Sequence, residues 1–504
     1  MALINSIISW FNIKRISKIE LMQKFPQEVQ VETFIDLINK AKDTEWGKKH
    51  DYKTIDSIEA FQEKVPIQEY DDVKPIINRL RKGESNLLWP GDIKWYAKSS
   101  GTTSDKSKYI PVSNESLDDC HFRGGKDILA IYANIYPETG IFKGKTLVLG
   151  GSHQIDNFNA QSYYGDLSAL IIENLPFWAK FLRAPSQEVA LLANWEDKIE
   201  KMANEAIAED ITAITGVPSW TLVLLKYILQ KTGKTNILDV WPNLELFIHG
   251  GVSFKPYRKQ FDKLIQGKTV RYLETYNASE GFFAIQTDLE SDDMMLMLDY
   301  GIFYEFQELD DYFNKTNKTY TIGEVELGVN YAIIITTNAG LWRYVVGDTV
   351  VFTSKNPYKI KISGRIKHYI NTFGEELIID NADKAIEVAV KKTGCEIKEY
   401  TAAPIFPSDK KIGGHEWIIE FVETPKDINF FAEVLDNALK SVNSDYEAKR
   451  YKNMTIDFPK IHIARQDLFY DWMKKRGKLG GQNKVPRLSN TRVYIDELIK
   501  MNKE

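Results

Sequence analysis

Hydroxyl and lysine side chains gather in the segment SSGTTSDKSK, residues 99–108. Backbone N–H groups and hydroxyls in such a loop can hold the oxygens of a phosphate, and a lysine can neutralise its charge. The segment follows the strand-like run IKWYA, but it lacks the glycine spacing of a P-loop or of a dinucleotide-binding turn. A solvated turn between two strands has the same composition. The segment alone therefore leaves both interpretations open.

A second polar segment, TYNASEGFFA at residues 275–284, combines a flat ring with an acid. Tyr276 stands beside small residues and could stack on a base, while Glu280 could hold Mg²⁺ through its oxygens. The same segment also fits the start of a helix capped by Ser279. The pattern therefore predicts either a nucleotide contact with a metal ligand or an ordinary helix N-terminus.

A third segment, LWRYVVGDTV at residues 341–350, places Gly347 and Asp348 between two apolar runs. Such a pair is typical of a hairpin turn. Asp348 could instead accept hydrogen bonds from the two hydroxyls of a ribose, as acidic residues do in nucleotide sites. Taken singly, this segment is ambiguous as well.

Near the C-terminus, the segment DWMKKRGKLGGQNKVPRLSN, residues 471–490, carries six basic residues against one acid. Its glycines at 477, 480 and 481 would allow a loop to move and to close over an anionic ligand. A solvated basic loop has the same composition. The segment therefore indicates a phosphate contact only in combination with the other three.

The elements that would position these segments alternate along the chain. The runs KTLVLGG (145–151), LELFIHGG (244–251) and VRYLETY (270–276) are short and apolar, which indicates buried strands. Helical spacing of apolar positions lies between them, over 187–207 and 220–233. Strands that alternate with helices predict a largely parallel sheet, and ligands bind at the carboxyl ends of its strands.

The pattern changes after about residue 295, where tight turns and few helices indicate an antiparallel sheet or a barrel. Helices are expected again over 381–393 and 427–442. The predicted fold class is α/β. It comprises a large N-terminal domain, residues 1–362, with mainly parallel α/β sheets plus a β-barrel-like part. A smaller, mobile C-terminal α/β domain follows, residues 363–504.

Bulk properties exclude several classes of protein. The 504 residues exceed a single core, and the formal net charge of −5 provides no basic field for nucleic acid or an anionic membrane. No apolar run is long enough to span a membrane, and the opening residues Ile4, Ile7, Ile8 and Phe11 have the spacing of a packed helix. The two distant cysteines fit a reducing compartment, so we expect a cytoplasmic protein. Histidine and cysteine spacings do not match a zinc site.

Five motifs, taken in order, resemble those of one family: SSGTT (99–103), GVPSW (216–220), ETYNASEG (274–281), WRYVVGD (342–348) and GGQNKVPR (480–487). The family is the Gretchen Hagen family of auxin-responsive acyl-acid amido synthetases, within the adenylate-forming superfamily of acyl-CoA synthetases and luciferases. The resemblance extends from about residue 15 to residue 495. The series is far more specific than any of its members.

The resemblance implies roles for individual residues. The phosphates of ATP would contact Ser99, Ser100, Gly101, Thr102, Thr103 and Lys108. Adenine and ribose would contact Gly250, Gly251, Thr275, Tyr276, Ala278, Ser279, Asp348 and Arg365. Catalysis would depend on Lys484 and on Glu280, the ligand of Mg²⁺, and the acyl substrate would contact Val217 and Trp220.

Two positions depart from the superfamily pattern. Asp105 precedes Lys106 where a glycine is usual, which makes Lys108 the better equivalent of the loop lysine. Ile366 and Lys367 follow Arg365 where acyl-CoA synthetases usually have an acid at the hinge between their domains. The second departure weakens the case for a thioester-forming enzyme.

The resemblance implies an ATP-dependent acyl-acid amido synthetase. With ATP and Mg²⁺ it would adenylate a carboxylic acid and pass the acyl group to an amino acid, and it would bind neither nucleic acid nor a membrane. Because the mixed anhydride with AMP supplies the leaving group, no covalent nucleophile of the enzyme is needed. The alternatives are an acyl-CoA synthetase and a non-catalytic nucleotide- or acyl-binding protein. The joint presence of Glu280, Asp348 and Lys484 disfavours the last.

Overall fold

The computed structural model describes residues 14–503, apart from 100–107, 151–155, 160, 193, 252–253, 255–256, 269, 367–368, 371–374, 376, 407–412, 444–445, 448–449, 451–455 and 480–483. The chain divides into two compact units. The large unit comprises Met1–Val252, Gln260–Val346 and Val350–Lys361. The small unit comprises Ser253–Lys259, Gly347–Thr349 and Ile362–Glu504. The expected opening helix around Ile4 to Phe11 lies outside the described residues.

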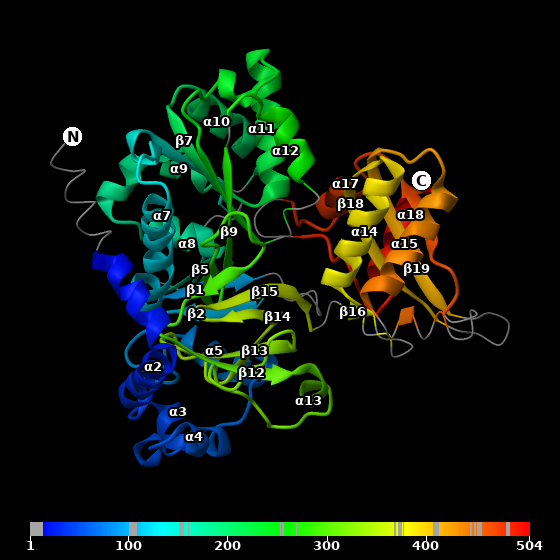
Figure 1. Cartoon of the computed structure of the whole chain (residues 1–504). Coiled ribbons are helices and arrows are strands. Elements are labelled where there is room, and N and C mark those ends of the chain that lie inside the picture. Colours follow the sequence, from blue (N-terminus) through cyan, green and yellow to red (C-terminus); the bar gives the residue numbers. More distant parts are fainter. Residues whose placement is uncertain are drawn as a thin grey trace. The chain divides into compact units, whose positions relative to one another are not determined.

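An 11-stranded sheet runs through the large unit, in the order β12-β13-β14-β15-β11-β10-β9-β8-β7-β3-β6. Its parallel half consists of β3 (Lys145–Val148), β6 (Arg183–Ala184), β7 (Ile211–Gly216), β8 (Leu246–Gly250) and β9 (Arg271–Ala278). Strands β7 and β8 are buried on both faces over most of their length, which is why their sequences are nearly continuous apolar runs. Helices α10 (Trp195–Ile207) and α11 (Pro218–Thr232) lie beside β7 in Figure 1.

The other half of the same sheet contains antiparallel pairs. It consists of β10 (Gly281–Ile285), β11 (Met294–Leu296), β12 (Ile302–Glu308), β13 (Asn330–Thr337), β14 (Tyr344–Lys355) and β15 (Tyr358–Arg365). Antiparallel pairing joins β9 to β10, β10 to β11, β11 to β15 and β12 to β13. The segment expected to be barrel-like thus extends the sheet of the parallel strands.

A 4-stranded sheet, in the order β2-β1-β5-β4, lies in the same unit. Its strands are β1 (Trp95–Ser99), β2 (Lys108–Val112), β4 (Asp156–Asn159) and β5 (Ser162–Gly165). The pair β1–β2 is antiparallel, whereas β1 and β5 are parallel. Tyr96 and Ala97 on β1 are fully buried, so this sheet is part of the main core.

Helices cover both sheets of the large unit. The longer ones are α2 (Pro26–Ala41), α4 (Ile58–Lys64), α5 (Tyr70–Leu80), α7 (Arg123–Ile135), α8 (Leu167–Glu173) and α12 (Arg258–Leu264). The shorter ones are α3 (Glu45–Lys49), η1 (Tyr52–Thr54), α6 (Asn114–Ser116), η2 (Leu117–Phe122), η3 (Ile141–Lys143), η4 (Phe177–Leu182), α9 (Gln187–Ala190), η5 (Ile237–Asp239) and α13 (Leu309–Phe313). Helix α11 begins with Pro218 and ends before Gly233, whose left-handed conformation suits a C-cap.

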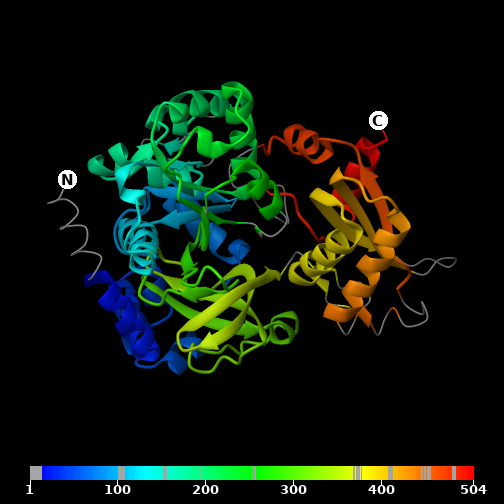
Figure 2. The same ribbon diagram turned by 45° about the horizontal axis from the view of Figure 1, so that its top comes forward.

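The small unit has a 3-stranded sheet with a core on each face. Its strands are β18 (Glu396–Ile405), β19 (Gly414–Glu423) and β20 (Lys460–Ala464). Its helices are α14 (Ile379–Thr393), α15 (Ile428–Val442), α17 (Leu468–Lys475) and α18 (Val493–Met501), and a short hairpin joins β16 (Tyr369–Ile370) to β17 (Leu377–Ile378). Trp417 and Ile419 belong to the core with α14 and α15, whereas Ile418 belongs to the core with α17 and α18. Figure 2 shows the strands and helices of this unit in yellow to red.

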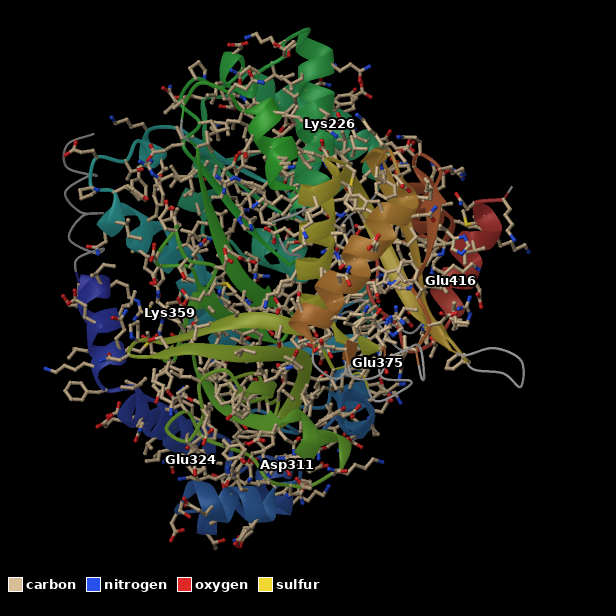
Figure 3. All side chains as sticks on the ribbon, turned by 45° about the vertical axis from the view of Figure 1, so that its right-hand side comes forward. Lys226, Asp311, Glu324, Lys359, Glu375 and Glu416 are labelled. Atoms are coloured by element: carbon tan, nitrogen blue, oxygen red, sulfur yellow. The ribbon has the colours of Figure 1, made fainter. Side chains whose placement is uncertain are left out.

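Buried charge also holds the small unit together. Glu375, labelled in Figure 3, is fully buried, and its Oε1 lies 2.9 Å from Nε2 of the equally buried His415. Glu416 accepts hydrogen bonds from Lys460, His462 and Arg492. Burial alone would raise the pKa of Glu416, but these three donors hold it well below its usual value.

The α/β fold class is confirmed, with its large N-terminal part and its smaller C-terminal part. The helices expected over 381–393 and 427–442 are α14 and α15. The helix expected over 187–207 is two helices, α9 and α10, because a turn intervenes at Leu191. Among the described residues, no helix is long and apolar enough to cross a membrane.

Candidate active site

The hydroxyl-rich segment begins and ends in a hairpin. Ser99 is the last residue of β1 and pairs with Lys108, the first residue of β2. Ser100, Gly101, Thr102 and Thr103 lie outside the described residues, as does the rest of 100–107. The two ends of the predicted phosphate loop are therefore neighbours on adjacent antiparallel strands.

Lys108 lies between two tyrosines. Its Nζ is 3.5 Å from the hydroxyl of Tyr344, and it lies 5.6 Å and 6.0 Å from the ring centroids of Tyr70 and Tyr344. Tyr344 is fully buried, and the Tyr70 hydroxyl accepts a hydrogen bond from the backbone N–H of Tyr109. Cation–π attraction from two fixed rings therefore positions the ammonium group at the end of the loop.

The glycine pair after β8 lies against β9. Gly250 pairs with Thr275 in parallel register, and a Cβ at Gly250 would stand only 2.4 Å from the carbonyl oxygen of Thr275. Gly251 has φ +84°, in the left-handed region that favours glycine. The close approach of the two strands therefore depends on glycine at this edge.

The segment with Tyr276 and Glu280 forms a hairpin. Tyr276 belongs to β9, Ala278 pairs with Gly281 of β10, and Ser279 and Glu280 form the turn between them. The alternative of a helix capped by Ser279 is therefore wrong. Tyr276 is buried, with its ring centroid 4.8 Å from that of Phe283.

Glu280 is half-buried in this turn. Among the described residues, no group of three or more His, Cys, Asp or Glu side chains is placed to hold a metal ion. A single carboxylate at a turn fits Mg²⁺, because this ion usually keeps several waters and is bound by one or two carboxylates plus substrate phosphates.

Three of the predicted contact regions lie at one edge of the sheet. The parallel strands β7, β8 and β9 are in register, with Gly216 opposite His249 and Gly250 opposite Thr275. Val217 and Trp220 follow β7 directly, at the start of α11, and both are half-buried. The predicted acyl, adenine and metal contacts thus share the carboxyl edge, where α/β sheets bind ligands.

A buried histidine that the sequence analysis missed lies behind the β9–β10 hairpin. His121 belongs to η2, a π-helix, and its side chain is hydrogen-bonded to Asn277 of β9. Burial lowers the pKa of His121 to about 4, because the charged imidazolium would lose its hydration there. In the preceding position, the Sγ of Cys120 accepts a hydrogen bond from the backbone N–H of Phe282 at 3.1 Å. The π-helix, a type often found at functional sites, therefore fixes the hairpin from behind.

A second missed residue, Arg343, fixes the start of β14. It is fully buried, and its Nε and Nη2 donate to the Glu305 carboxylate at 3.0 Å and 2.9 Å. Its Nη1 donates to the carbonyl oxygens of Gln62 and Val65. Breaking this pair would leave an unpaired buried charge, so the pair is strongly held. Because Tyr344 is the next residue in the chain, the network also fixes its backbone position.

Gly347 and Asp348 lie inside β14, so the hairpin-turn alternative is wrong. Both belong to the small unit, together with Arg365 at the end of β15. Arg365 Nε donates to Asp348 Oδ1 at 2.7 Å, and the backbone N–H of Ile366 donates to the Gly347 carbonyl at 2.9 Å. The predicted ribose acid is therefore already engaged with the predicted hinge arginine.

Lys484 belongs to the same unit and lies near charged groups. Its pKa is lowered to about 8, first by desolvation among crowded protein atoms and then by the charge of Arg365 and of Arg487, while Asp348 opposes the shift. The residue retains solvent-exposed surface, so water screens part of these charges. The preceding residues 480–483 lie outside the described part of the chain.

Comparison with known proteins defines the class. Residues 15–270 match the GH3 family N-terminal domain, residues 295–365 the GH3 family central domain and residues 380–493 the GH3 family C-terminal domain. The chain belongs to the GH3 family. The resemblance inferred from the five motifs is confirmed.

Two relatives from Arabidopsis thaliana illustrate the family. The chain is 22% identical to indole-3-acetic acid-amido synthetase GH3.3, over 94% of this chain and 91% of the relative. It is also 22% identical to 4-substituted benzoates-glutamate ligase GH3.12, over 85% of this chain and 87% of the relative. The first relative is named as an amido synthetase of an acid, and the second as a ligase of benzoates and glutamate.

Solved structures show the same fold. The GH3.15 acyl acid amido synthetase superposes with a TM-score of 0.80 and 16% identity, covering 97% of this chain and 95% of that one. A 2-hydroxyisobutyryl-CoA ligase in complex with an acyl-AMP superposes with a TM-score of 0.60 and 14% identity, covering 94% and 91%. The fold is thus shared with adenylate-forming enzymes that make either amides or thioesters.

Proposed function

We propose that the protein is an ATP-dependent acyl-acid amido synthetase. The observation that carries the proposal is the carboxyl edge of β7, β8 and β9, which brings together Val217, Gly250 and the turn with Glu280. Val217 and Glu280 belong to two separate motifs, GVPSW and ETYNASEG, of the five that resemble the GH3 series. Membership of a family whose named relatives are amido synthetases supports the same activity.

The reaction has two steps. A carboxylate oxygen of the acid attacks the α-phosphorus of ATP, forming the P–O bond of an acyl-adenylate and breaking the bond to pyrophosphate. The neutral amine of an amino acid then attacks the carbonyl carbon, so that a C–N bond forms, AMP leaves and a proton is released. The enzyme must supply alignment and positive charge around the phosphates rather than a nucleophile.

In this proposal the loop that ends at Lys108 contacts the phosphates, through Ser99, Ser100, Gly101, Thr102, Thr103 and Lys108. The nucleoside contacts Gly250, Gly251, Thr275, Tyr276, Ala278, Ser279, Asp348 and Arg365. Glu280 would hold Mg²⁺, which when bound neutralises phosphate charge. Lys484 provides a further cation to the phosphate and carboxylate oxygens.

We assign the division of labour as follows. Residues 1–362 form the domain that binds ATP and the acyl group, and residues 363–504 form the smaller domain that supplies Lys484. Val217 and Trp220 contribute apolar surface to the acyl pocket. The buried thiols of Cys120 and Cys395 are compatible with a reducing, cytoplasmic environment.

The test is pyrophosphate release with ATP and Mg²⁺, measured with and without acids of the indole, benzoate and fatty types. We expect release that requires an acid, and an amide product once amino acids are added. The Glu280→Gln variant should lose most of this activity. Glu290→Gln is the matched control, since Glu290 is exposed in the next connection along the chain and should leave activity unchanged.

Other outcomes would contradict the proposal. A thioester formed with coenzyme A, and no amide with any amino acid, would make the protein an acyl-CoA synthetase. Binding of ATP without release for any acid would make it a nucleotide-binding protein without turnover.

A further inference from the structure

The chain just after Lys484 is fastened along β18 by its backbone. Thr401 Oγ1 donates to the carbonyl oxygen of Pro486 at 2.5 Å, and the backbone N–H of Ala402 donates to the carbonyl oxygen of Arg487 at 2.8 Å. The N–H of Ser489 returns a bond to the Ala402 carbonyl at 3.1 Å. The segment 486–489 therefore pairs with β18 almost as a short added strand.

The Arg487 side chain fastens the same segment to a second element. It forms an ion pair with Asp383 of α14, and its Nε lies 3.7 Å from Oε1 of Glu399 on β18. The guanidinium carbon also lies 5.1 Å from the ring centroid of Tyr400, whose hydroxyl donates to Asp383. Arg487 is buried, so this bridge between α14 and β18 is shielded from solvent.

A residue from a distant part of the sequence completes the cluster. Tyr257 is buried, and its hydroxyl lies 3.4 Å from Oε2 of Glu399. Burial raises the pKa of Tyr257 well above its usual value, with the Glu399 carboxylate adding to the effect, so its hydroxyl keeps its proton and remains a donor. Arg487, the two carboxylates and the two tyrosines therefore form one buried network.

Only Val485 and Pro486 separate this network from Lys484. Proline fixes one backbone dihedral, and Val485 packs against the core formed with α17 and α18. Leu479, on the other side of residues 480–483, packs against the same core. The backbone position of Lys484 is thus constrained from its C-terminal side, where Arg487 is anchored.

We propose that Arg487 is a positioning residue for Lys484, acting through its ion pair with Asp383 and its contact with Tyr400. This inference rests on the proposed function, because it presumes that Lys484 acts on ATP. The Arg487 side chain is engaged by Asp383, Glu399 and Tyr400. It holds the two-residue link, Val485 and Pro486, that positions the lysine.

The variant Arg487→Lys keeps the charge but loses the planar fork that reaches Asp383 and Glu399 together. We expect the rate of pyrophosphate release at saturating ATP to fall about 10- to 100-fold, the range expected for a catalytic group misplaced by about 1 Å, with KM for ATP changed far less. Tyr400→Phe removes only the bond to Asp383. The rate of pyrophosphate release should fall less than in Arg487→Lys, because Arg487 and Asp383 both keep their charges.

Arg450→Lys is the matched control. Arg450 is buried in the same unit, donates Nε and Nη2 to Asp436 at 2.7 Å and 2.8 Å, and donates Nη1 to the carbonyl oxygen of Ile456. Thermal unfolding should report similar destabilisation of Arg450→Lys and Arg487→Lys. Only the latter should lose turnover per folded molecule. Equal losses of turnover in the two variants would overturn the proposal.

A second readout does not require turnover. An acyl phosphate of ATP transfers its acyl group to lysines beside the triphosphate, and peptide mass spectrometry can quantify labelling of Lys484 and Lys108 separately. In Arg487→Lys we expect labelling of Lys484 to fall while that of Lys108 is retained. Labelling of Lys484 at the wild-type level would refute the positioning role alone. Failure of the wild-type protein to label either lysine would refute the proposed ATP site, and the positioning role with it.

Discussion

Lys108 in the large unit and Lys484 in the small unit each follow a loop of small and polar residues, yet their surroundings differ. Lys108 lies between the rings of Tyr70 and Tyr344, one of which is fully buried. Lys484 lies where the charges of Arg365, Arg487 and Asp348 act on it. One lysine is positioned by fixed aromatic faces and the other is influenced by neighbouring ions.

The protein thus surrounds the two lysine ammonium groups differently, with aromatic rings at Lys108 and with charged side chains at Lys484. Aromatic rings attract a cation with modest energy and do not move, because the network of Arg343 and Glu305 holds Tyr344 in place. Two guanidinium groups near Lys484 instead oppose its positive charge. A polyanion bound beside Lys484 would relieve this repulsion, so we expect Lys484 to contribute most when the phosphates carry most charge, in the transition state.

The largest effect should come from replacing the two lysines separately. Lys484→Met should lower the rate of acid-dependent ATP–pyrophosphate exchange by about 10²- to 10³-fold, as loss of one electrostatic contact to the transition state does. Lys108→Met should mainly raise KM for ATP, by about 10-fold, because it removes one contact that ground and transition states share. Exchange kinetics over a range of ATP concentrations separate the two outcomes.

If the two variants instead had the same kinetic pattern, the contrast between the two surroundings would carry no functional meaning. Circular dichroism and thermal unfolding of both variants serve as controls, since neither lysine is part of a core. A large loss of rate in Lys108→Met alone would reverse the assignment of roles.

Much of this arrangement could be predicted from the sequence. Short apolar runs correctly indicated β3, β8 and β9. The signal is clearest at β8, because a strand buried on both faces has few polar residues. Helical spacing located α14 and α15 to within a few residues. Ser99 and the turn at Ser279 and Glu280 lie at strand ends as predicted, whereas Gly347 and Asp348 lie inside β14.

The partners of buried charges could not be predicted. Arg343 and Glu305 are 38 residues apart and meet because β12 and β14 flank β13, a pairing that no local pattern encodes. The same applies to Arg487 and Asp383, which are 104 residues apart. The segment around Gly347 and Asp348 has the residues of a turn, but the sheet extends it into a long strand. Tertiary pairing overrode local preference there.

A smaller effect is expected at the acid that faces both Arg365 and Lys484. Asp348→Asn would weaken hydrogen bonds to the ribose and remove the charge paired with Arg365, so KM for ATP should rise about 10- to 100-fold, corresponding to about 1.5–3 kcal/mol for bonds to a charged group. Turnover at saturating ATP should change less. Steady-state kinetics and direct nucleotide binding by calorimetry both measure this change.

Asp293→Asn provides the matched control for that variant. Like Asp348, Asp293 is buried and forms an ion pair with a basic side chain. Its Oδ1 lies 3.2 Å from Nζ of Lys359, which is labelled in Figure 3, and it belongs to the connection before β11. Its replacement should lower thermal stability and leave KM for ATP unchanged. An unchanged KM in Asp348→Asn would exclude the ribose contact.

The smallest effect, and the most specific to Lys484, is a dependence on pH. The pKa of Lys484 is lowered to about 8 by desolvation and by the charge of Arg365, so the ammonium is present below this pH and is lost as pH rises through it. If the charged form is the active one, kcat/KM for ATP in ATP–pyrophosphate exchange, which reports the enzyme without bound nucleotide, should be flat below this range, halved near pH 8 and lower above it. Exchange is measured without amine, because deprotonation of an amino acid would raise the rate of the second step over the same pH range.

Added salt should move the descending limb of this pH profile to higher pH, since Lys484 is in contact with solvent that screens the guanidinium charges. Lys484→Arg should lose the limb while retaining any residual rate, because guanidinium stays charged throughout. A limb that persists in Lys484→Arg would belong to another group, and the contrast between the two lysines would then rest on position alone.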